Sequence, residues 1–148
     1  MIKRTKSRVR GVSLYVLPTH RDERGSLIAG EFESQIGFAP KRYFMVFDVP
    51  GMKIRGQHAH RKCRQFLICV KGTLNVQVTD GVRKQTYTLN RLNVGLSIPP
   101  MVWCVHYNYR PGTILLVFAS HHYDPSNYVR NYDDYLRRVK RKVRRAAP

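Results

Sequence analysis

The amino-acid sequence predicts an all-β jelly roll, a sandwich or barrel of short strands, with a single helix at its C-terminal end. Seven segments rich in apolar, β-branched or aromatic residues recur at spacings of roughly ten residues, which is typical of sandwiches and barrels. Turn signals separate them, including Asp80-Gly81, Pro99-Pro100 and Pro111-Gly112. A chain of 148 residues, 43% of them hydrophobic, is long enough for one folded domain with its own core.

The predicted strands differ in the faces that they bury. Tyr43–Val49 is apolar and aromatic throughout, which predicts a strand buried on both faces. Thr73–Thr79 alternates instead, with an apolar residue at every second position, and Asp80-Gly81 then predicts a hairpin into the next strand. The seven predicted strands are Tyr43–Val49, Gln65–Lys71, Thr73–Thr79, Val82–Leu89, Val94–Ile98, Trp103–Tyr107 and Thr113–Ala119.

One helix is expected near the end of the chain, within Asn131–Val143. Tyr132, Tyr135, Leu136 and Val139 recur there at helical spacing, so we expect one face of this helix to pack on the barrel. Helix signals appear in no other segment. The sequence therefore predicts an all-β domain that carries one C-terminal helix.

Positive charge is concentrated at both ends of the chain. The formal net charge is +18, from 27 Lys and Arg residues against 9 acidic residues. Residues 1–10 and 137–148 are rich in Lys and Arg and contain no acidic residue. We therefore expect a domain over residues 11–136 between two solvated basic tails, and nucleic-acid binding is not expected as the main function. Attraction of the tails to anionic lipid, RNA or an acidic protein is the alternative.

Targeting signals and cysteine usage favour a cytoplasmic protein. The apolar run after the basic start covers only Val12–Leu17, and Ser13 and Tyr15 interrupt it, so we expect neither a signal peptide nor a membrane span. An odd number of dispersed cysteines without a CxxC pair predicts free thiols in a reducing compartment. These cysteines are Cys63, Cys69 and Cys104.

His58 and His60 are the strongest candidates for chemistry. Residues two apart in a strand project from the same face, so the two imidazoles are expected to lie together. Such a pair could hold a metal, transfer protons, or form a hydrogen-bonded pair in the core. Around it the sequence reads G-x-H-x-H-x4-Q-x6-G, from Gly56 through Gln65 to Gly72.

A second segment reads G-x3-P-x4-C, from Gly95 through Pro99 to Cys104. Together the two segments resemble the two motifs of the cupin family, whose metal-binding members use two histidines and a carboxylate from the first motif and a histidine from the second. Here Gln65 takes the carboxylate position and Cys104 the third histidine position. An amide is a poor ligand for a hard divalent cation, so neither a metal nor another cofactor is expected. The two histidines and Cys104 could still hold zinc.

Further matching segments occur in order between about residues 12 and 136. They are Asp22–Leu27, Lys41–Arg42, Arg55–His60, Val94–Leu96, Pro100–Trp103, Leu116–Ser120 and, as a last block, Tyr123–Asp124 with Tyr128–Asp133. These blocks resemble the WxcM-like sugar 3,4-ketoisomerase branch of the cupins. The resemblance implies a metal-free isomerase that converts a dTDP-4-keto-6-deoxyhexose to its 3-keto isomer through an enediol, for deoxysugar and aminosugar biosynthesis. It also implies a homodimer with strands exchanged between subunits.

The same resemblance suggests roles for individual residues. We expect His58 to be the base that removes the proton from C3, and His60 to position or relay a proton at a sugar oxygen. Arg24 or Arg55 would stabilise the oxyanion, and Arg42 would face the diphosphate. The predicted substrate-binding residues are Arg24, Arg42, Arg55, Gln65, Trp103, Cys104 and His106.

Two positions depart from the pattern of the family. The tyrosine that usually follows the Lys-Arg pair is Phe44 here, and the histidine or arginine that usually follows Trp103 is Cys104. His106 shares the strand face of Cys104 and could replace part of the lost group. These departures leave the C4 configuration of the product open. They also leave two alternatives, a non-catalytic cupin that binds sugar nucleotides and a related cupin sugar epimerase.

Overall fold

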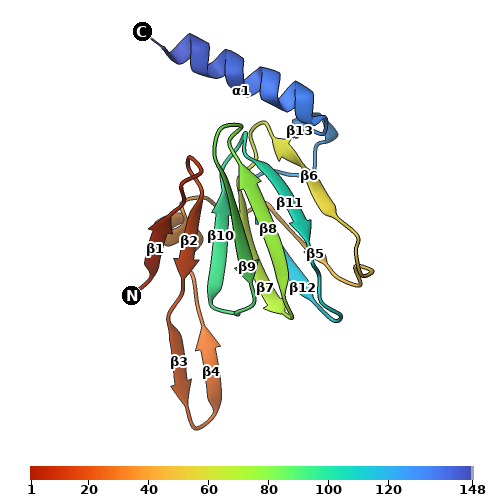
Figure 1. The fold of residues 1–148 in the computed structure, drawn as a ribbon. Helices are drawn as coiled ribbons and strands as arrows, with labels where there is room; N and C mark the ends of the chain where they lie inside the picture. The colour runs from red at the N-terminus through yellow and green to blue at the C-terminus, as the bar shows by residue number, and fades with distance from the viewer. Residues whose placement is uncertain (148) are drawn as a thin grey trace.

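The computed structural model describes residues 1–147, and its two larger β-sheets form a jelly-roll barrel (Figure 1). In order across the first sheet, the strands are β1 (Lys3–Lys6), β2 (Ser13–Val16), β10 (Val94–Ile98), β7 (Gln65–Lys71), β12 (Ile114–Ala119) and β5 (Arg42–Val46). The second sheet contains β13 (Tyr128–Val129), β6 (Arg55–His60), β11 (Trp103–Tyr107), β8 (Leu74–Thr79) and β9 (Lys84–Leu89). A separate hairpin consists of β3 (Thr19–Asp22) and β4 (Gly25–Ile28).

The core lies between the two larger sheets. Leu67 of β7 and Val117 of β12 are fully buried from one side, and Val76 and Val78 of β8 are fully buried from the other. Alternate residues of each strand point inward, so the apolar positions of both sheets meet in one cluster. The predicted all-β jelly roll is confirmed.

The C-terminal helix α1 (Tyr132–Ala146) packs on the outer side of the barrel. The side chain of Asn131 caps its first turn by accepting a hydrogen bond from the Asp134 N–H. Tyr135 is fully buried, and its hydroxyl donates to the carbonyls of Thr79 and Met101. The predicted helix is therefore confirmed, with its apolar face against the barrel. Within residues 1–147, no helix is long and apolar enough to cross a membrane.

Two short helical turns complete the structure. The first, η1 (Phe32–Ile36), packs Phe32 against Phe118 of β12, with ring centres 4.7 Å apart. The second, η2 (Pro125–Asn127), precedes β13, and Asp124 caps it by accepting from the Ser126 N–H. Both turns lie in connections between strands, and η2 is followed directly by β13, the short strand beside β6.

Strand β5 differs from its prediction. The apolar run Tyr43–Val49 was expected to be buried on both faces, but Tyr43 is 65% exposed and Met45 is 51% exposed. β5 is the edge strand of its sheet and pairs only with β12. Its inward residues Phe44 and Val46 contact the core, whereas nothing in the described part of the chain covers the other face. The prediction of two buried faces was wrong for this strand.

The basic N-terminal segment is also more ordered than expected. Residues 1–10 were expected to be a solvated tail, but β1 pairs with β2, with Lys3 opposite Val16. The four side chains of β1 stay exposed while its backbone pairs, which an edge strand allows, and Val9 is fully buried. At the other end, residues 137–146 continue α1. Regular structure thus extends beyond both boundaries expected for the domain.

The three cysteines are free thiols. Cys63, Cys69 and Cys104 are all buried, and none is paired in a disulfide. Cys69 and Cys104 belong to the core between the sheets, where a thiol acts as a small apolar group. The prediction of free thiols is confirmed for the described residues.

Candidate functional site

The two histidines of β6 meet inside the barrel. His58 and His60 lie two residues apart on this strand, and their ring centres are 4.9 Å apart in an edge-to-face arrangement. β6 pairs with β11 so that His58 lies opposite Cys104, which is part of the core. Paired residues of antiparallel strands project to the same face, so both imidazoles face the interior. The structure therefore brings these side chains together as the sequence predicted.

Hydrogen bonding fixes the tautomer of His58. Its Nδ1 atom lies 3.0 Å from the carbonyl oxygen of Gly56. A carbonyl only accepts, so Nδ1 carries the proton and Nε2 holds the free lone pair. Burial lowers the pKa of His58, as does the positive charge of Arg130, while the Gly56 carbonyl acts in the opposite direction. At neutral pH, this side chain is an uncharged base with one nitrogen available.

His60 is buried without a partner for either ring nitrogen. Its side chain is 6% exposed, and neither Nδ1 nor Nε2 forms a hydrogen bond within the described structure. The pKa of His60 is lowered to about 3, mainly by burial and then by the charges of His58, Arg42, Arg130 and His121 in that order. Leaving buried polar atoms unpaired is costly, so their presence beside His58 points to a place for a polar ligand.

Tyr128 of β13 and Arg130, which directly follows this strand, lie beside the two histidines. Tyr128 pairs with His60 in the sheet, and the centre of its ring lies 5.0 Å from that of His58 and 4.4 Å from that of His60. The guanidinium of Arg130 lies 4.3 Å from the centre of the Tyr128 ring. The two imidazoles, the phenol and this guanidinium therefore form one compact group.

Arg42 approaches the same group from the first residue of β5. Its Nε atom is buried without a hydrogen-bond partner, and its guanidinium lies 5.2 Å from the ring centre of Phe44 and 5.4 Å from that of Tyr123. The positive charge of Arg42 is one of those that lower the pKa of His60. We call His58, His60, Arg42, Tyr128 and Arg130 the histidine site.

The neighbouring strand β11 carries a second polar pair deeper in the barrel. The Sγ atom of Cys104 lies 3.2 Å from Nε2 of His106, and both side chains are buried. Burial raises the pKa of the Cys104 thiol, so the sulfur stays protonated. The pKa of His106 is also lowered to about 3, mainly by burial and then by the charges of His58 and Arg55. The pair is neutral, and its members contact each other.

A β-bulge places Arg55 beside this second pair. The register of β6 and β11 shifts between Cys104 and Val105, and Arg55 then lies opposite His106. Gly56 has a φ of 80°, and a Cβ atom at this position would lie 2.8 Å from the carbonyl oxygen of Cys104. The glycine is therefore required for the bulge, which turns Arg55 to the face of His58.

Two predicted substrate-binding residues lie away from the histidine site. Trp103 is on the outer face of β11, where its ring centre is 5.0 Å from that of Tyr132 and 5.4 Å from that of Tyr135. Adjacent residues of a strand point to opposite faces, so Trp103 cannot share the inward face of the next residue. Arg24 lies at the turn of the β3–β4 hairpin, exposed and 2.6 Å from the carboxylate of Asp22.

Gln65, which takes the carboxylate position of the cupin metal motif, is buried at the start of β7, and no cluster of metal ligands lies among the described residues. Gln65 begins β7, is 5% exposed, and lies opposite Ala119 of β12. Among residues 1–147, no three His, Cys, Asp or Glu side chains lie close enough together to hold a metal ion. His58, His60 and Cys104, the set considered for zinc, are thus not arranged as a ligand cluster.

A basic hollow lies beside the histidine site. Its volume is about 690 Å³, which is within the range of small-molecule sites. Lys41, next to Arg42, and His121, whose charge lowers the pKa of His60, both contribute to its wall. The lining residues are Lys41, Arg61, Lys62, His121, His122, Asp124, Ser126 and Asn127. A wall with several cations and one carboxylate suits an anionic group such as a phosphate.

The sequence alone gave no role to Tyr128 or Arg130. Both lie in a segment that matches the family pattern, two residues apart, so they were available as candidates. What was missing was the pairing of β13 with β6, which joins residues far apart in the chain. Similarly, Tyr109 became visible only in the structure, where its buried hydroxyl has no hydrogen-bond partner.

Comparison with known proteins identifies relatives of the whole barrel. The sequence profile of the family described as "FdtA: WxcM-like, C-terminal" matches residues 10–140. The TDP-4-oxo-6-deoxy-alpha-D-glucose-3,4-oxoisomerase of Aneurinibacillus thermoaerophilus is 38% identical over 118 residues, which cover 80% of this chain and 85% of the relative.

Solved structures agree with this relationship. The 3,4-ketoisomerase QdtA of Thermoanaerobacterium thermosaccharolyticum, crystallised as a histidine-to-asparagine mutant with TDP-4-keto-6-deoxyglucose, has a TM-score of 0.86 and 33% identity, covering 90% of this chain and 97% of QdtA. The RmlC epimerase of Mycobacterium tuberculosis has a TM-score of 0.74 at 17% identity, covering 85% of this chain and 71% of the epimerase. The latter likeness is one of fold alone, and it confirms the cupin architecture.

Proposed function

The chain belongs to the WxcM-like family of FdtA, and from this premise we propose that it is a sugar 3,4-ketoisomerase acting on a TDP-linked 4-keto-6-deoxyhexose. The observation that carries the proposal is the uncharged His58 with its Nε2 atom free, next to the unpartnered His60. Relatives with the same fold over most of their length are named as isomerases of such sugars. The free Nε2 atom of His58 supports its assignment as the base that this reaction needs.

The reaction begins with loss of the proton on C3, which the neighbouring C4 carbonyl makes acidic. We assign this step to Nε2 of His58, because its lone pair is free while Nδ1 is held by Gly56. The product of the step is an enediolate shared by C3 and C4. Transfer of the C3 hydroxyl proton to the C4 oxygen, together with return of a proton to the C4 carbon, leaves a carbonyl at C3 and a hydroxyl at C4.

His60 suits the transfer of a proton between the two sugar oxygens. Both of its nitrogens lack a partner, so a neutral imidazole can accept a proton at one and donate at the other. Its pKa of about 3 keeps it neutral under ordinary conditions. Tyr128, whose ring packs on both imidazoles, supplies a phenol at the histidine site.

The negative charge of the intermediate needs cations nearby. Arg42 and Arg130 lie at the histidine site, and each lowers the pKa of His60 through its charge. The same charges favour an enediolate over the neutral ketone. The diphosphate of the substrate would lie in the adjoining basic hollow, where Lys41 and Lys62 are exposed.

Cys104 limits what can return the proton at C4. Its thiol stays protonated and contacts His106, so it is not the base of the reaction. We propose that protonated His58 returns the proton to the same face of the enediolate from which it removed one. The C4 carbon would then receive its proton on the face of the sugar that lies toward His58, and this face determines the C4 configuration of the product.

The test of the proposed function is conversion of TDP-4-keto-6-deoxyglucose in D2O, followed by NMR. The proposal predicts a 3-keto product with deuterium at C4, and exchange at C3 in the remaining substrate. The same incubation with the His58→Asn variant should give neither. Binding of the sugar nucleotide without label in either position would instead identify a non-catalytic binding protein.

We also propose that the chain forms a homodimer through β5 and the β3–β4 hairpin. The outer face of β5 exposes Tyr43 and Met45, and such an apolar edge favours burial against a second copy. The hairpin extends away from the barrel (Figure 1), and nearly all of its residues are exposed. Exchange of this hairpin would carry Arg24 toward the histidine site of the neighbouring subunit.

Complementation tests the exchanged hairpin directly. Arg24→Ala and His58→Asn variants should each be inactive alone, because each damages every site of its own homodimer. After mixed refolding, half of the dimers would be heterodimers in which one site has both residues intact, so about a quarter of the activity should return. Activity that stays at the level of the single variants would contradict the exchange, and a monomer in light scattering would contradict the dimer.

The expected cytoplasmic location also remains a proposal. Three buried free thiols and a nucleotide-linked substrate support it. Fractionation of cells that produce the chain would test it, with recovery outside the cytoplasmic membrane as the contradicting result.

A further inference from the structure

Helix α1 presents a stripe of positive charge on the side away from the barrel. Tyr135, fully buried, and Leu136 and Val139 pack on the barrel. Arg137, Arg141 and Arg144 are exposed and lie about half a helical turn away from Tyr135. A basic residue at each of these three positions is not needed for packing, since their side chains contact solvent. The stripe is a surface feature in its own right.

Repulsion between its own basic side chains destabilises the second half of α1. Residues 140–147 are all exposed, and five of them are Lys or Arg. Basic pairs four residues apart, such as Arg137 with Arg141 and Lys140 with Arg144, repel one another. The one ion pair of α1 in the described structure, Asp134 with Arg138, lies in its first half. A polyanion bound to these last two turns would remove the repulsion.

The N-terminal segment and the β8–β9 hairpin enlarge this charged surface. A Cβ atom at Gly81, in the turn of the hairpin, would lie 2.8 Å from Val139, so the turn touches α1. Asp80 of the same turn accepts from the Arg10 N–H, and the Arg83 guanidinium donates to the Arg8 carbonyl. The three segments thus meet at one end of the molecule.

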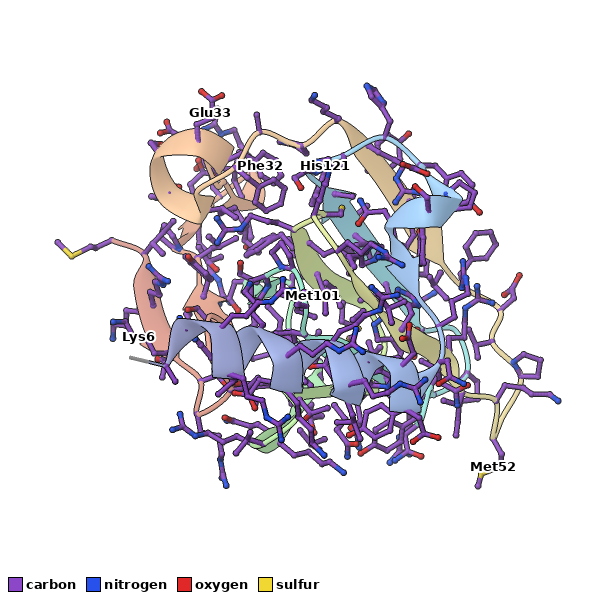
Figure 2. The ribbon with its side chains drawn as sticks, turned by 90° about the horizontal axis from the view of Figure 1, so that it is seen from above. Lys6, Phe32, Glu33, Met52, Met101 and His121 are labelled. Carbon is purple, nitrogen blue, oxygen red and sulfur yellow. The ribbon has the colours of Figure 1, made fainter. Side chains whose placement is uncertain are left out.

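We call this surface the basic face. Figure 2, viewed from above, shows α1 lying across this end of the barrel. Its exposed residues are Arg8, Arg10, Arg83, Arg137, Lys140, Arg141, Lys142, Arg144 and Arg145. The acidic groups of these three segments are Asp80 and, in the first turn of α1, Asp133 and Asp134. The carboxylate of Asp80 already accepts three backbone N–H groups, from Arg10, Val82 and Arg83, and Asp134 is paired with Arg138. The basic face is therefore available to an external anion.

We propose that the basic face docks the protein on the surface of an anionic phospholipid bilayer. A row of Lys and Arg near such a surface gains about 1 kcal/mol for each residue. α1 is the outermost element at its end of the molecule (Figure 1), so a flat surface can reach it along its length. Docking by charge, without insertion of the helix, fits α1, because its apolar face is already used against the barrel.

Two observations favour a bilayer over a nucleic acid. Val82, at the tip of the hairpin that touches α1, is 87% exposed, and Val143 is 62% exposed among the basic residues. Isolated apolar side chains within a basic surface can enter the headgroup region, whereas they gain nothing from a phosphate backbone. α1 also contains no Asn or Gln to contact base edges. The basic face thus combines charge with exposed apolar tips, and within α1 it lacks the amide side chains that contact adenine.

Vesicle sedimentation with the full chain tests this proposal. The chain is mixed with phosphatidylcholine vesicles, with or without phosphatidylglycerol, at low and at physiological ionic strength. A variant with Arg137→Gln, Arg141→Gln and Arg144→Gln removes the stripe. A matched variant with Lys71→Gln, Arg91→Gln and Arg110→Gln removes the same charge from exposed loops and strand ends outside the basic face. Circular dichroism verifies that both variants fold.

The proposal predicts binding to the phosphatidylglycerol vesicles alone, at least about tenfold weaker for the stripe variant and little changed for the matched variant. Both variants should retain isomerase activity on soluble substrate. Binding to neutral vesicles, no binding at all, or equal loss in the two variants would overturn it. Displacement from vesicles by duplex DNA at an equal phosphate concentration would also overturn it, in favour of a nucleic-acid surface.

Discussion

Strands β6 and β11 lie side by side, but the histidine pair of β6 and the Cys104–His106 pair of β11 differ in what their atoms are free to do. On β6, Nε2 of His58 and both nitrogens of His60 lack a protein partner. On β11, Cys104 and His106 contact each other at 3.2 Å. The first pair can take a ligand without breaking a contact, whereas the second cannot.

The difference shows how a barrel separates chemistry from packing. Burial lowers the pKa of all three histidines, so loss of positive charge does not by itself identify a catalytic residue. What distinguishes His58 and His60 is their neighbours, which are Arg42 of β5, Arg130 after β13 and the hollow beside them. The candidate site is therefore where nitrogen lone pairs are free and lie next to arginines, as at His58 and His60. Cys104 and His106 contact each other instead and belong to the buried interior.

The largest expected effect is a contrast between one substitution in each pair. His58→Gln should lower kcat/KM by about a thousandfold, because it removes the general base. His106→Gln should lower kcat/KM by less than about tenfold, with its main cost in the free energy of unfolding, because a buried contact is lost. Steady-state kinetics and urea unfolding of both variants measure this. Equal losses of kcat/KM in the two variants would show that His106 also takes part in the reaction, and would contradict the difference between the two pairs.

Arg42→Gln should raise the KM for the nucleotide sugar by about thirtyfold, because a charged contact to the diphosphate or the enediolate is removed. The same variant should raise the pKa of His60, since the charge of Arg42 is one cause of its low value. Kinetics and NMR titration give the two readouts. Arg110→Gln, an exposed arginine outside the site, serves as the control. An unchanged KM would remove Arg42 from the site.

Stability should fall in weak acid, because the buried histidines resist protonation. The pKa values of His60 and His106 drop from 6.5 when unfolded to about 3 when folded. Between these values the unfolded state binds more protons, so the free energy of unfolding decreases as pH falls. From about pH 6 to about pH 5, the loss is on the order of 2 kcal/mol for the two groups. Urea unfolding across this range measures it, and His106→Gln should halve the slope.

Trp103→Phe should affect stability but not substrate binding. Trp103 packs beneath α1 against Tyr132 and Tyr135, on the face opposite His58. The smaller ring leaves part of this contact empty, at a cost of about 1 kcal/mol in the free energy of unfolding. KM should stay within about twofold of the original value, since Phe keeps the surface apolar. A large rise in KM would instead show that Trp103 contributes to substrate binding, as predicted from the sequence.

The periodicity of the sequence was sufficient for most of the fold. Alternation and turn residues located the strands because each depends on neighbours in the chain, and helical spacing located α1 for the same reason. The prediction for β5 was wrong because an apolar run of this kind does not distinguish a strand with two buried faces from an edge strand with one exposed face. The N-terminal strand was missed since its basic side chains stay in solvent and only its backbone pairs.

The site was predictable where strand geometry alone determines it. His58 and His60 share a face by simple alternation, and the same rule could have placed Trp103 opposite Cys104. Tyr128 reaches the histidines through a pairing of distant segments, and the position of Arg55 depends on a bulge at Gly56. Such contacts arise from the assembled barrel, and local sequence does not contain them.

The protonation state of His58 decides whether this side chain can act as the base of the reaction. Long-range 1H–15N NMR of the imidazoles, with the His58→Asn variant to assign the signals, reports both the tautomer and the pKa. We expect a proton on Nδ1, a free Nε2, and a pKa below 6.5. A proton on Nε2 at neutral pH, or a pKa above 6.5, would contradict the assignment of His58 as the base.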